Sequence, residues 1–394
     1  MTQSPNTSIL VKLVLLLASS MTVMAGATIS PALPSMAKAF SSTPNVSLLI
    51  PLVLTMPALF IAICGTASGA VIDKWGRKNL LLLSLALYGV AGTSGFFLSS
   101  LSAILVGRAV LGVAVAGIMT TCTTLVADYF AGEQRHQFMG IQASFMSFGG
   151  VLFLTLGGFL AQANWRSPFL IYLFAFLVLP LAAYAIYEPQ KAEVQINHSL
   201  NEENVNWPLK QLALVYSLAL GGMIIFYMIP VKLPFLLSDL KLGNAAQAGM
   251  AIACSTLASG ITSTQFQRVR AKFNFSAITS FVFLLMGIGY AVIAISSTYV
   301  QILLGLIISG LGMGLLIPNL NVGLVEIIPL KLRGRAVGGL TTAIFLGQFL
   351  SPLVSQPISN ATSLSFSYLI MGIFMLLLAL GFGWTQFKPK PKLS

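Results

Sequence analysis

Long apolar runs recur from one end of this sequence to the other. Twelve of them are long enough to cross about 30 Å of hydrocarbon as α-helices. The first six lie near residues 11–33, 46–71, 79–99, 102–127, 138–161 and 168–187, and the second six near 210–236, 246–267, 275–296, 299–325, 336–358 and 364–386. Only 8% of the 394 residues are charged, against about 25% in a typical soluble protein. We therefore predict an all-α polytopic membrane protein.

The first apolar run has features of a cleavable signal peptide, because Lys12 precedes it and Ala25-Gly26-Ala27 interrupts it. The apolar stretch continues to Pro34, however, and many further spans follow. This pattern favours a retained first helix.

The longest polar segment runs from Glu188 to Pro208, between the two sets of six runs. It predicts a six-helix bundle over residues 1–188, a linker over 189–208 and a second six-helix bundle over 209–394. Sixteen of the 21 Lys and Arg residues fall on the side that also holds both ends of the chain, and four fall on the other side. Both termini are therefore predicted to be cytoplasmic.

The two sets of runs show signs of an internal repeat. At an offset of 198 residues, Asp128 matches Glu326 and Arg135 matches Arg333. Four glycines match at the same offset: 107, 112, 140 and 149 with 305, 310, 338 and 347. An acid and a base that match together are informative in a chain with so few charges. The repeat predicts two pseudo-symmetric halves with a substrate site between them, as in many transporters.

The polar turn between the second and third spans reads Gly-Ala-Val-Ile-Asp-Lys-Trp-Gly-Arg-Lys. It resembles the loop signature of the major facilitator superfamily, Gly-x-Leu-x-Asp-Arg-x-Gly-Arg-Lys. The residues that agree are Gly69, Asp73, Gly76, Arg77 and Lys78, whereas Val71 and Lys74 replace the Leu and the first Arg. The chain resembles the twelve-helix drug:proton antiporter (multidrug efflux) branch, which implies the major facilitator fold.

The resemblance also implies a charged cytoplasmic latch. In the family pattern, the loop acid, the loop Arg and an acid at the end of helix four hold the two halves together. Asp73, Arg77 and Asp128 are of the right type and order, and Arg135 follows Asp128 by seven residues. A plain topology-anchoring loop is the alternative. In the second half, Glu326 and Arg333 are expected to pair, either as a matching latch or as ordinary helix-end stabilisation.

Arg108 is the one basic residue placed inside the first six spans. The pattern Arg108-x-x-x-Gly112 resembles the helix-four signature of the superfamily, which implies a role in proton coupling or substrate contact. Snorkelling to the outer surface is the alternative. The fifth span departs from the antiporter pattern Gly-x-x-x-Gly-Pro-x-x-Gly-Gly, because Phe153 and Leu154 replace the central Gly-Pro.

In this architecture, helices one, four, seven and ten line a central cavity. The predicted substrate contacts are Thr28, Thr121, Thr124, Tyr227, Asn319 and Asn321. Helix packing is the alternative for each, although buried amides and phenols need partners. None of the nine acidic residues falls in the middle of a span, so a polycationic substrate would lack a counter-charge. A small neutral or anionic amphipathic substrate is predicted.

The leading functional hypothesis is a secondary active transporter that works by alternating access and exports its substrate in exchange for protons. The alternative is a uniporter, or an importer of a small metabolite such as a sugar derivative. Two loop His and three isolated Cys offer no enzyme centre and no metal site, and no nucleotide-binding loop is present. We expect no cofactor, with the proton gradient as energy source. The expected partners are the substrate, protons and the lipid bilayer, without nucleic acid. We predict a monomer in the plasma membrane (bacterial inner membrane).

Overall fold

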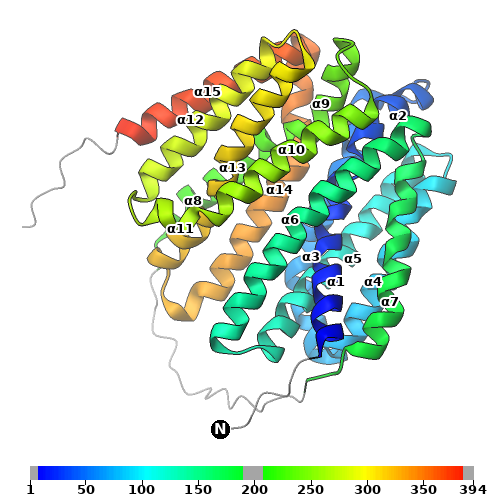
Figure 1. Ribbon diagram of the computed structural model, residues 1–394, viewed down its shortest axis with the longest axis vertical. Helices are drawn as coiled ribbons and strands as arrows, with labels where there is room; N and C mark the ends of the chain where they lie inside the picture. The colour runs from blue at the N-terminus through cyan, green and yellow to red at the C-terminus, as the bar shows by residue number, and fades with distance from the viewer. Residues whose placement is uncertain (1–7, 190–206, 385–394) are drawn as a thin grey trace, which may run out of the picture.

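The structure is a computed structural model that describes residues 8–189 and 207–384. Within these ranges every regular element is a helix (Figure 1). The first group comprises α1 (Ile9–Ala27), η1 (Ser30–Ala32), α2 (Leu33–Ala39), α3 (Val46–Trp75), α4 (Arg77–Phe97), α5 (Leu101–Tyr129), α6 (Gly132–Ala163), η2 (Ser167–Leu173) and α7 (Phe174–Ala185). The second comprises α8 (Leu209–Phe226), α9 (Met228–Asp239), α10 (Ala245–Thr264), α11 (Phe266–Arg270), α12 (Phe275–Ala294), α13 (Tyr299–Ile327), η3 (Leu330–Leu332), α14 (Arg333–Ala361) and α15 (Leu364–Trp384).

Eleven helical segments of the described residues are long and apolar enough to cross a membrane. The twelfth expected span corresponds to α10, which has 20 residues but is rich in Ala, Gly, Ser and Thr. It packs against α6 and α13, so small side chains suit its position between other helices. The chain therefore has the predicted all-α fold, and the linker predicted over 189–208 lies mostly outside the described residues.

Both halves pack their helices in the same pattern, where the N-terminal half is residues 8–189 and the C-terminal half is residues 207–384. In the first, α5 packs on α3 and α4, and α1 packs on α6. In the second, α13 packs on α10 and α12, and α8 packs on α14. The helices that pack together occupy the same positions in the order of spans within each half. The fold is thus two copies of one arrangement, as the repeat predicts.

The halves meet chiefly through α6 with α10 and α3 with α14. At one end, called here the sealed end, the Ser30 hydroxyl donates a hydrogen bond to the Pro230 carbonyl across the seam. Close by, a Cβ at Gly249 would lie 2.9 Å from the Gly158 Cα, so the glycines let α6 and α10 touch backbone to backbone.

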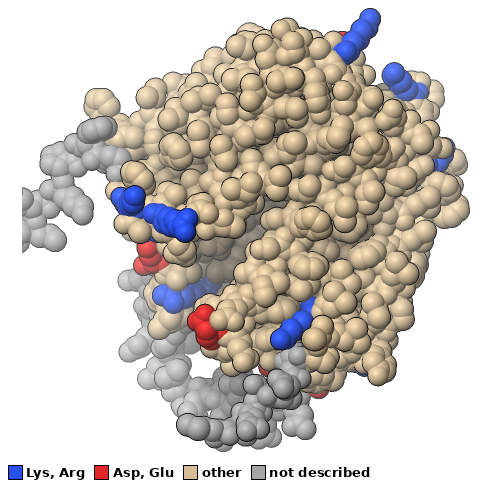
Figure 2. Space-filling view, in the orientation of Figure 1, with Lys and Arg blue, Asp and Glu red and all other residues tan. Residues whose placement is uncertain are grey.

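At the opposite end, called here the charged end, lie Gly76–Lys78, Gly132–Arg135, Arg270 and Arg333. Here α6 is exposed on almost all sides from Gly132 to Ser144, whereas it is buried at Gly149 and Gly150. Figure 2 shows acidic and basic side chains at this end and a hollow between the two halves. The halves are therefore closed at the sealed end and apart at the charged end.

Candidate functional site

A cavity of about 500 Å³ lies between the two halves. It is lined by α1, α3, α5 and α6 on one side and by the α8–α9 junction, α10, α13 and α14 on the other. Its walls carry Met24, Met119, Met146 and Met313 together with aromatic and hydroxyl side chains. Pockets of this size that combine apolar walls with a few polar groups are typical of small-molecule sites.

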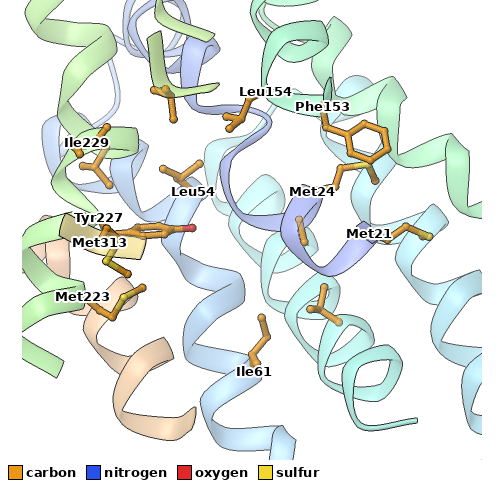
Figure 3. Close-up of a cluster of buried hydrophobic side chains, with 14 of the residues drawn as sticks. Met21, Met24, Leu54, Ile61, Phe153, Leu154, Met223, Tyr227, Ile229 and Met313 are labelled. Atoms are coloured by element: carbon orange, nitrogen blue, oxygen red, sulfur yellow. The ribbon is translucent and has the colours of Figure 1, made fainter. Parts of the chain in front are cut away.

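Tyr227 crosses the cavity from the C-terminal half. It occupies the break between α8 and α9, and Figure 3 shows its ring extending toward α1, the helix that carries Met24. A Cβ on Gly26 would lie only 2.6 Å from the Tyr227 hydroxyl oxygen. Only glycine at position 26 therefore lets the phenol reach α1 without a shift.

Three of the predicted substrate contacts line the cavity: Thr28, Tyr227 and Asn321. The other three do not. The Thr124 hydroxyl donates to the Thr120 carbonyl of its own helix, at 2.9 Å, and Thr121 is fully buried within the N-terminal half. The Asn319 amide donates to the Phe275 carbonyl at 3.1 Å, so it joins α13 to α12.

Arg108 is only 1% exposed and is absent from the cavity lining. Its guanidinium donates to the Val53 carbonyl at 2.9 Å, to the Ala25 carbonyl at 2.6 Å and to the Tyr172 hydroxyl at 2.8 Å. Pro57 stands four residues after Val53 and has no N–H to donate, so it leaves that carbonyl open. Arg108 does not reach the surface, and it serves as a junction between α5, α3, α1 and η2.

Two tyrosine pairs that no sequence motif marks stabilise the breaks in the first helix of each half. The Tyr88 and Tyr172 hydroxyls donate to the Met21 and Ala25 carbonyls of α1. Tyr290 and Tyr368 donate to the Ile225 and Met228 carbonyls beside the α8–α9 break. The rings of each pair pack at 58°, with centroids 5.6 Å apart in the first pair and 5.2 Å in the second. In each pair one acceptor, Ala25 or Ile225, lies in the last turn of its helix, where backbone partners run out.

The loop that opened the family resemblance forms a charged clasp, defined here as Arg77, Asp128 and Glu188. The Arg77 Nε lies 3.0 Å from the Asp128 Oδ2. The Glu188 carboxylate accepts from the backbone N–H groups of Arg77 and Lys78, at 2.8 Å each, so it caps the start of α4. Gly76 has φ +85°, and a Cβ there would lie 2.9 Å from the Glu188 carboxylate.

All three members of the clasp belong to the N-terminal half, and the structure places no cross-half contact on them. The side chain of Asp73, the first predicted latch acid, lies outside the described residues. Arg135 is exposed and makes no hydrogen bond or ion pair with the described residues, and nothing lies within 4 Å of a Cβ at Gly69. The third member, Glu188, was predicted as the last residue of the first bundle and was not expected to take part in the latch.

The expected pair between Glu326 and Arg333 does not form. Instead the Arg270 Nη2 lies 2.6 Å from the Glu326 Oε1, so α11 rather than α14 supplies the partner. Arg333 donates to the Val325 and Ile328 carbonyls at the end of α13. Arg333 follows the short helix η3, and from there its guanidinium reaches the last carbonyls of α13 rather than the acid.

The C-terminal half also buries one cation. Lys232 on α9 is 3% exposed, and its Nζ donates to the Gln356 Oε1 and, at 3.1 Å, to the Ser359 Oγ of α14. Both partners are neutral. Lys232 lies outside the cavity lining, close to the sealed end.

Two repeated six-helix halves that enclose a central cavity, closed at one end and open at the other, define a polytopic membrane transporter. The model of the Major Facilitator Superfamily matches residues 15–242 and 212–394. The chain therefore belongs to the major facilitator superfamily, and it is a transporter, not an enzyme.

Relatives of known name are distant. The chain is 24% identical over 354 residues to the tetracycline resistance protein, class E, of Escherichia coli, which covers 85% of this chain and 84% of that protein. It is 32% identical over 167 residues to the bacillibactin exporter of Bacillus subtilis (strain 168), a match over 40% of this chain and only 39% of that protein.

Solved structures agree on the fold. A bacterial homolog of the human lysosomal transporter Spinster matches with a TM-score of 0.80 at 14% identity, over 97% of this chain and 98% of that one. The D-xylose–proton symporter matches with a TM-score of 0.76 at 19% identity, over 97% of this chain and 98% of that one. At such low sequence identities, the structural similarity is evidence for the fold and not for the function.

Proposed function

We propose that this transporter exports a small amphipathic compound, neutral or anionic, in exchange for protons and by alternating access. The observation that carries the proposal is the cavity between the halves, which is mainly apolar and is edged with hydrogen-bonding groups. Two relatives support export: one is named as a tetracycline resistance protein and the other as a bacillibactin exporter. The first of these matches along most of both chains.

The proposed setting is the bacterial inner membrane, with both termini cytoplasmic and the protein acting as a monomer. Most Lys and Arg residues lie on the side that this topology places inside. The charged end is then cytoplasmic, and the described conformation is inward-facing. A compound from the cytoplasm would enter the cavity directly, as export requires.

The charged clasp is the proposed place of proton exchange. Among the described residues, the acids lie at the charged end, apart from Asp239 at the other end. Protonation of Asp128 would remove its ion pair with Arg77 and loosen the contact between the start of α4 and the end of α5. Asp73, from the same loop, remains a predicted participant.

A uniporter or importer of a small metabolite is the second candidate. It is favoured by one observation, that none of the described cavity-lining residues is a carboxylate that could carry a proton along the substrate path. In that case the clasp would only stabilise the loop.

Purified protein in liposomes that contain a pH-sensitive dye separates the two candidates. With tetracycline as the probe and an imposed proton gradient, antiport predicts substrate-dependent proton movement. Asp128→Asn should abolish the proton movement, and Glu133→Gln, an exposed acid outside the clasp, should not. Tetracycline movement without proton flux would overturn antiport and leave the facilitator.

A further inference from the structure

The two walls of the cavity differ in chemistry. The N-terminal half contributes Met24, Met119 and Met146, with aliphatic side chains such as Leu54 and Ile61 between them. Its only polar side chains on the wall are Thr22 and Thr28. Both hydroxyls donate to their own helix, Thr22 to the Ser19 carbonyl at 2.7 Å and Thr28 to the Met24 carbonyl at 2.6 Å. This wall therefore offers no free donor to a ligand.

The C-terminal half presents the free polar groups. Ser259 and Gln348 line the cavity from this side, and their side chains make no hydrogen bond with the described residues. Tyr227 is not counted with them, because its hydroxyl reaches across the cavity to Gly26 of α1. The Asn321 Nδ2 donates a hydrogen bond to the Ile317 carbonyl at 3.0 Å, and the Asn321 Oδ1 remains available to accept one from a ligand. Together these groups supply donors and acceptors from α10, α13 and α14.

No Asp, Glu, Lys, Arg or His is among the described residues that line the cavity. The two buried cations are engaged elsewhere: Arg108 by α1, α3 and η2, and Lys232 by α14. A charged ligand would lose its hydration without gaining a partner of opposite sign. The absence of a cation removes the reason for expecting an anionic substrate.

We infer that the cavity selects an uncharged amphipathic molecule and orients it, with its hydrogen-bonding end against the C-terminal half and its apolar end against the methionine wall. Met side chains adapt to different apolar shapes, so the N-terminal wall tolerates variety. The polar wall then fixes the direction in which the ligand lies. This inference deepens the proposed function, because it concerns the substrate of the same cavity.

Equilibrium binding to the purified protein tests the inference without any transport step. The probes are three fluorescent dyes: uncharged Nile red, cationic ethidium and anionic carboxyfluorescein. Nile red should bind at least about tenfold more tightly than either ion, because a buried ion without a partner is strongly disfavoured. Equal affinity of either charged dye for the wild type would overturn the requirement for an uncharged ligand.

The orientation is tested with matched pairs of variants. Gln348→Leu and Ser259→Ala should each weaken Nile red binding by about fivefold, because the loss of one neutral hydrogen bond costs roughly 1 kcal/mol. The controls Gln134→Leu and Ser99→Ala change exposed residues outside the cavity lining and should leave binding unchanged. Unchanged affinity in both cavity variants would overturn the polar wall.

A variant that gains ethidium binding must be folded, so its result cannot be attributed to poor folding. Gln348→Glu should create ethidium binding, because it adds an anion where the polar end of the ligand lies. Met119→Glu should weaken Nile red binding and create no ethidium site. Ethidium binding in both variants would show that the ligand has no fixed direction. A transport assay with the same dyes distinguishes the two claims: if Nile red binds but is not moved, the proposed export fails and the inference stands.

Discussion

The two halves stabilise the broken first helix with the same device and differ in what they add to it. Tyr172 and Tyr368 occupy equivalent places, and each donates to a carbonyl beside a break. In the N-terminal half Arg108 joins the tyrosine, whereas the residue 198 positions later, Leu306, is a fully buried apolar side chain. The shared tyrosines belong to the repeat, and the arginine belongs to one copy.

The loops at the charged end repeat this contrast. In the N-terminal half, Glu188 ties the end of the bundle back to the start of α4, and Arg77 pairs with Asp128. In the C-terminal half, the described residues at the corresponding place form one ion pair, between Arg270 and Glu326, and Arg333 donates to carbonyls at the end of α13. The N-terminal half therefore has additional contacts at both places, from Arg108 at the break in its first helix and from Glu188 at the charged end. We expect it to act as the stiffer body when the halves move.

Replacing Arg108 with leucine, the residue of the other half, should produce the largest effect. Arg108→Leu leaves the Ala25 and Val53 carbonyls with fewer partners, and each buried unpaired acceptor costs about 1–3 kcal/mol. We expect a loss of about 2–4 kcal/mol, measured as unfolding of the purified protein in detergent. Arg166→Leu, at the sealed end, should cost much less. If Arg108→Leu changed the unfolding free energy only slightly, the guanidinium would not make the N-terminal half more stable than the C-terminal half.

Gly76→Ala comes next in size. The φ of +85° with ψ of 164° at this residue is essentially restricted to glycine, and a Cβ would strike the Glu188 carboxylate. The change should cost about 1–3 kcal/mol in unfolding free energy. Gly140→Ala is the matched control, because nothing lies within 4 Å of its added Cβ and its φ is helical. Equal stability of the two variants would show that Glu188 does not restrain α4.

Removing one hydroxyl from each tyrosine pair sharpens the comparison between the halves. Tyr368→Phe loses one hydrogen bond, to the Met228 carbonyl, and should cost about 1 kcal/mol. Tyr172→Phe also removes the acceptor of Arg108, so we expect about 2 kcal/mol. In the double variant Tyr172→Phe with Arg108→Leu, the two losses should be less than additive, since they share one network. Equal costs for Tyr172→Phe and Tyr368→Phe would contradict the asymmetry.

The sequence was sufficient to predict the spans, because apolar runs and the scarcity of charge are strong local signals. The repeat was predictable from the acid and base that match at one offset, Asp128 with Glu326 and Arg135 with Arg333. Neither signal says which residue meets which across the bundle. The predicted partner of Glu326 was wrong for this reason: sequence proximity favoured Arg333, and the fold brings Arg270 instead.

The missed contacts share one physical cause: they join side chains to backbone carbonyls or N–H groups that lie far away in the chain. Tyr172 reaches a carbonyl 147 residues earlier, and Glu188 reaches a backbone N–H 111 residues earlier. Backbone groups have no residue-type signature, so no motif marks such pairs. The wall of the cavity was partly predictable, because Thr28 and Tyr227 lie beside the breaks. The position of Gln348 was not predictable, since the helix that carries it, α14, was not expected to line the cavity.

The smallest expected effect separates the two loops at the charged end. Arg77→Gln and Arg270→Gln each break one ion pair at the surface, and such pairs contribute about 0.2–1 kcal/mol. The Arg77–Asp128 side chains are 18% and 26% exposed, against 24% and 51% for Arg270–Glu326, so salt should screen the second pair more. Thermal unfolding at low and high ionic strength measures this. Arg77→Gln should lower stability at both salt levels, and Arg270→Gln only at low salt. If both variants lose their effect at high salt, the Arg77–Asp128 pair is an ordinary surface pair, and the greater stiffness of the N-terminal half would have to come from Arg108 and the Glu188 cap.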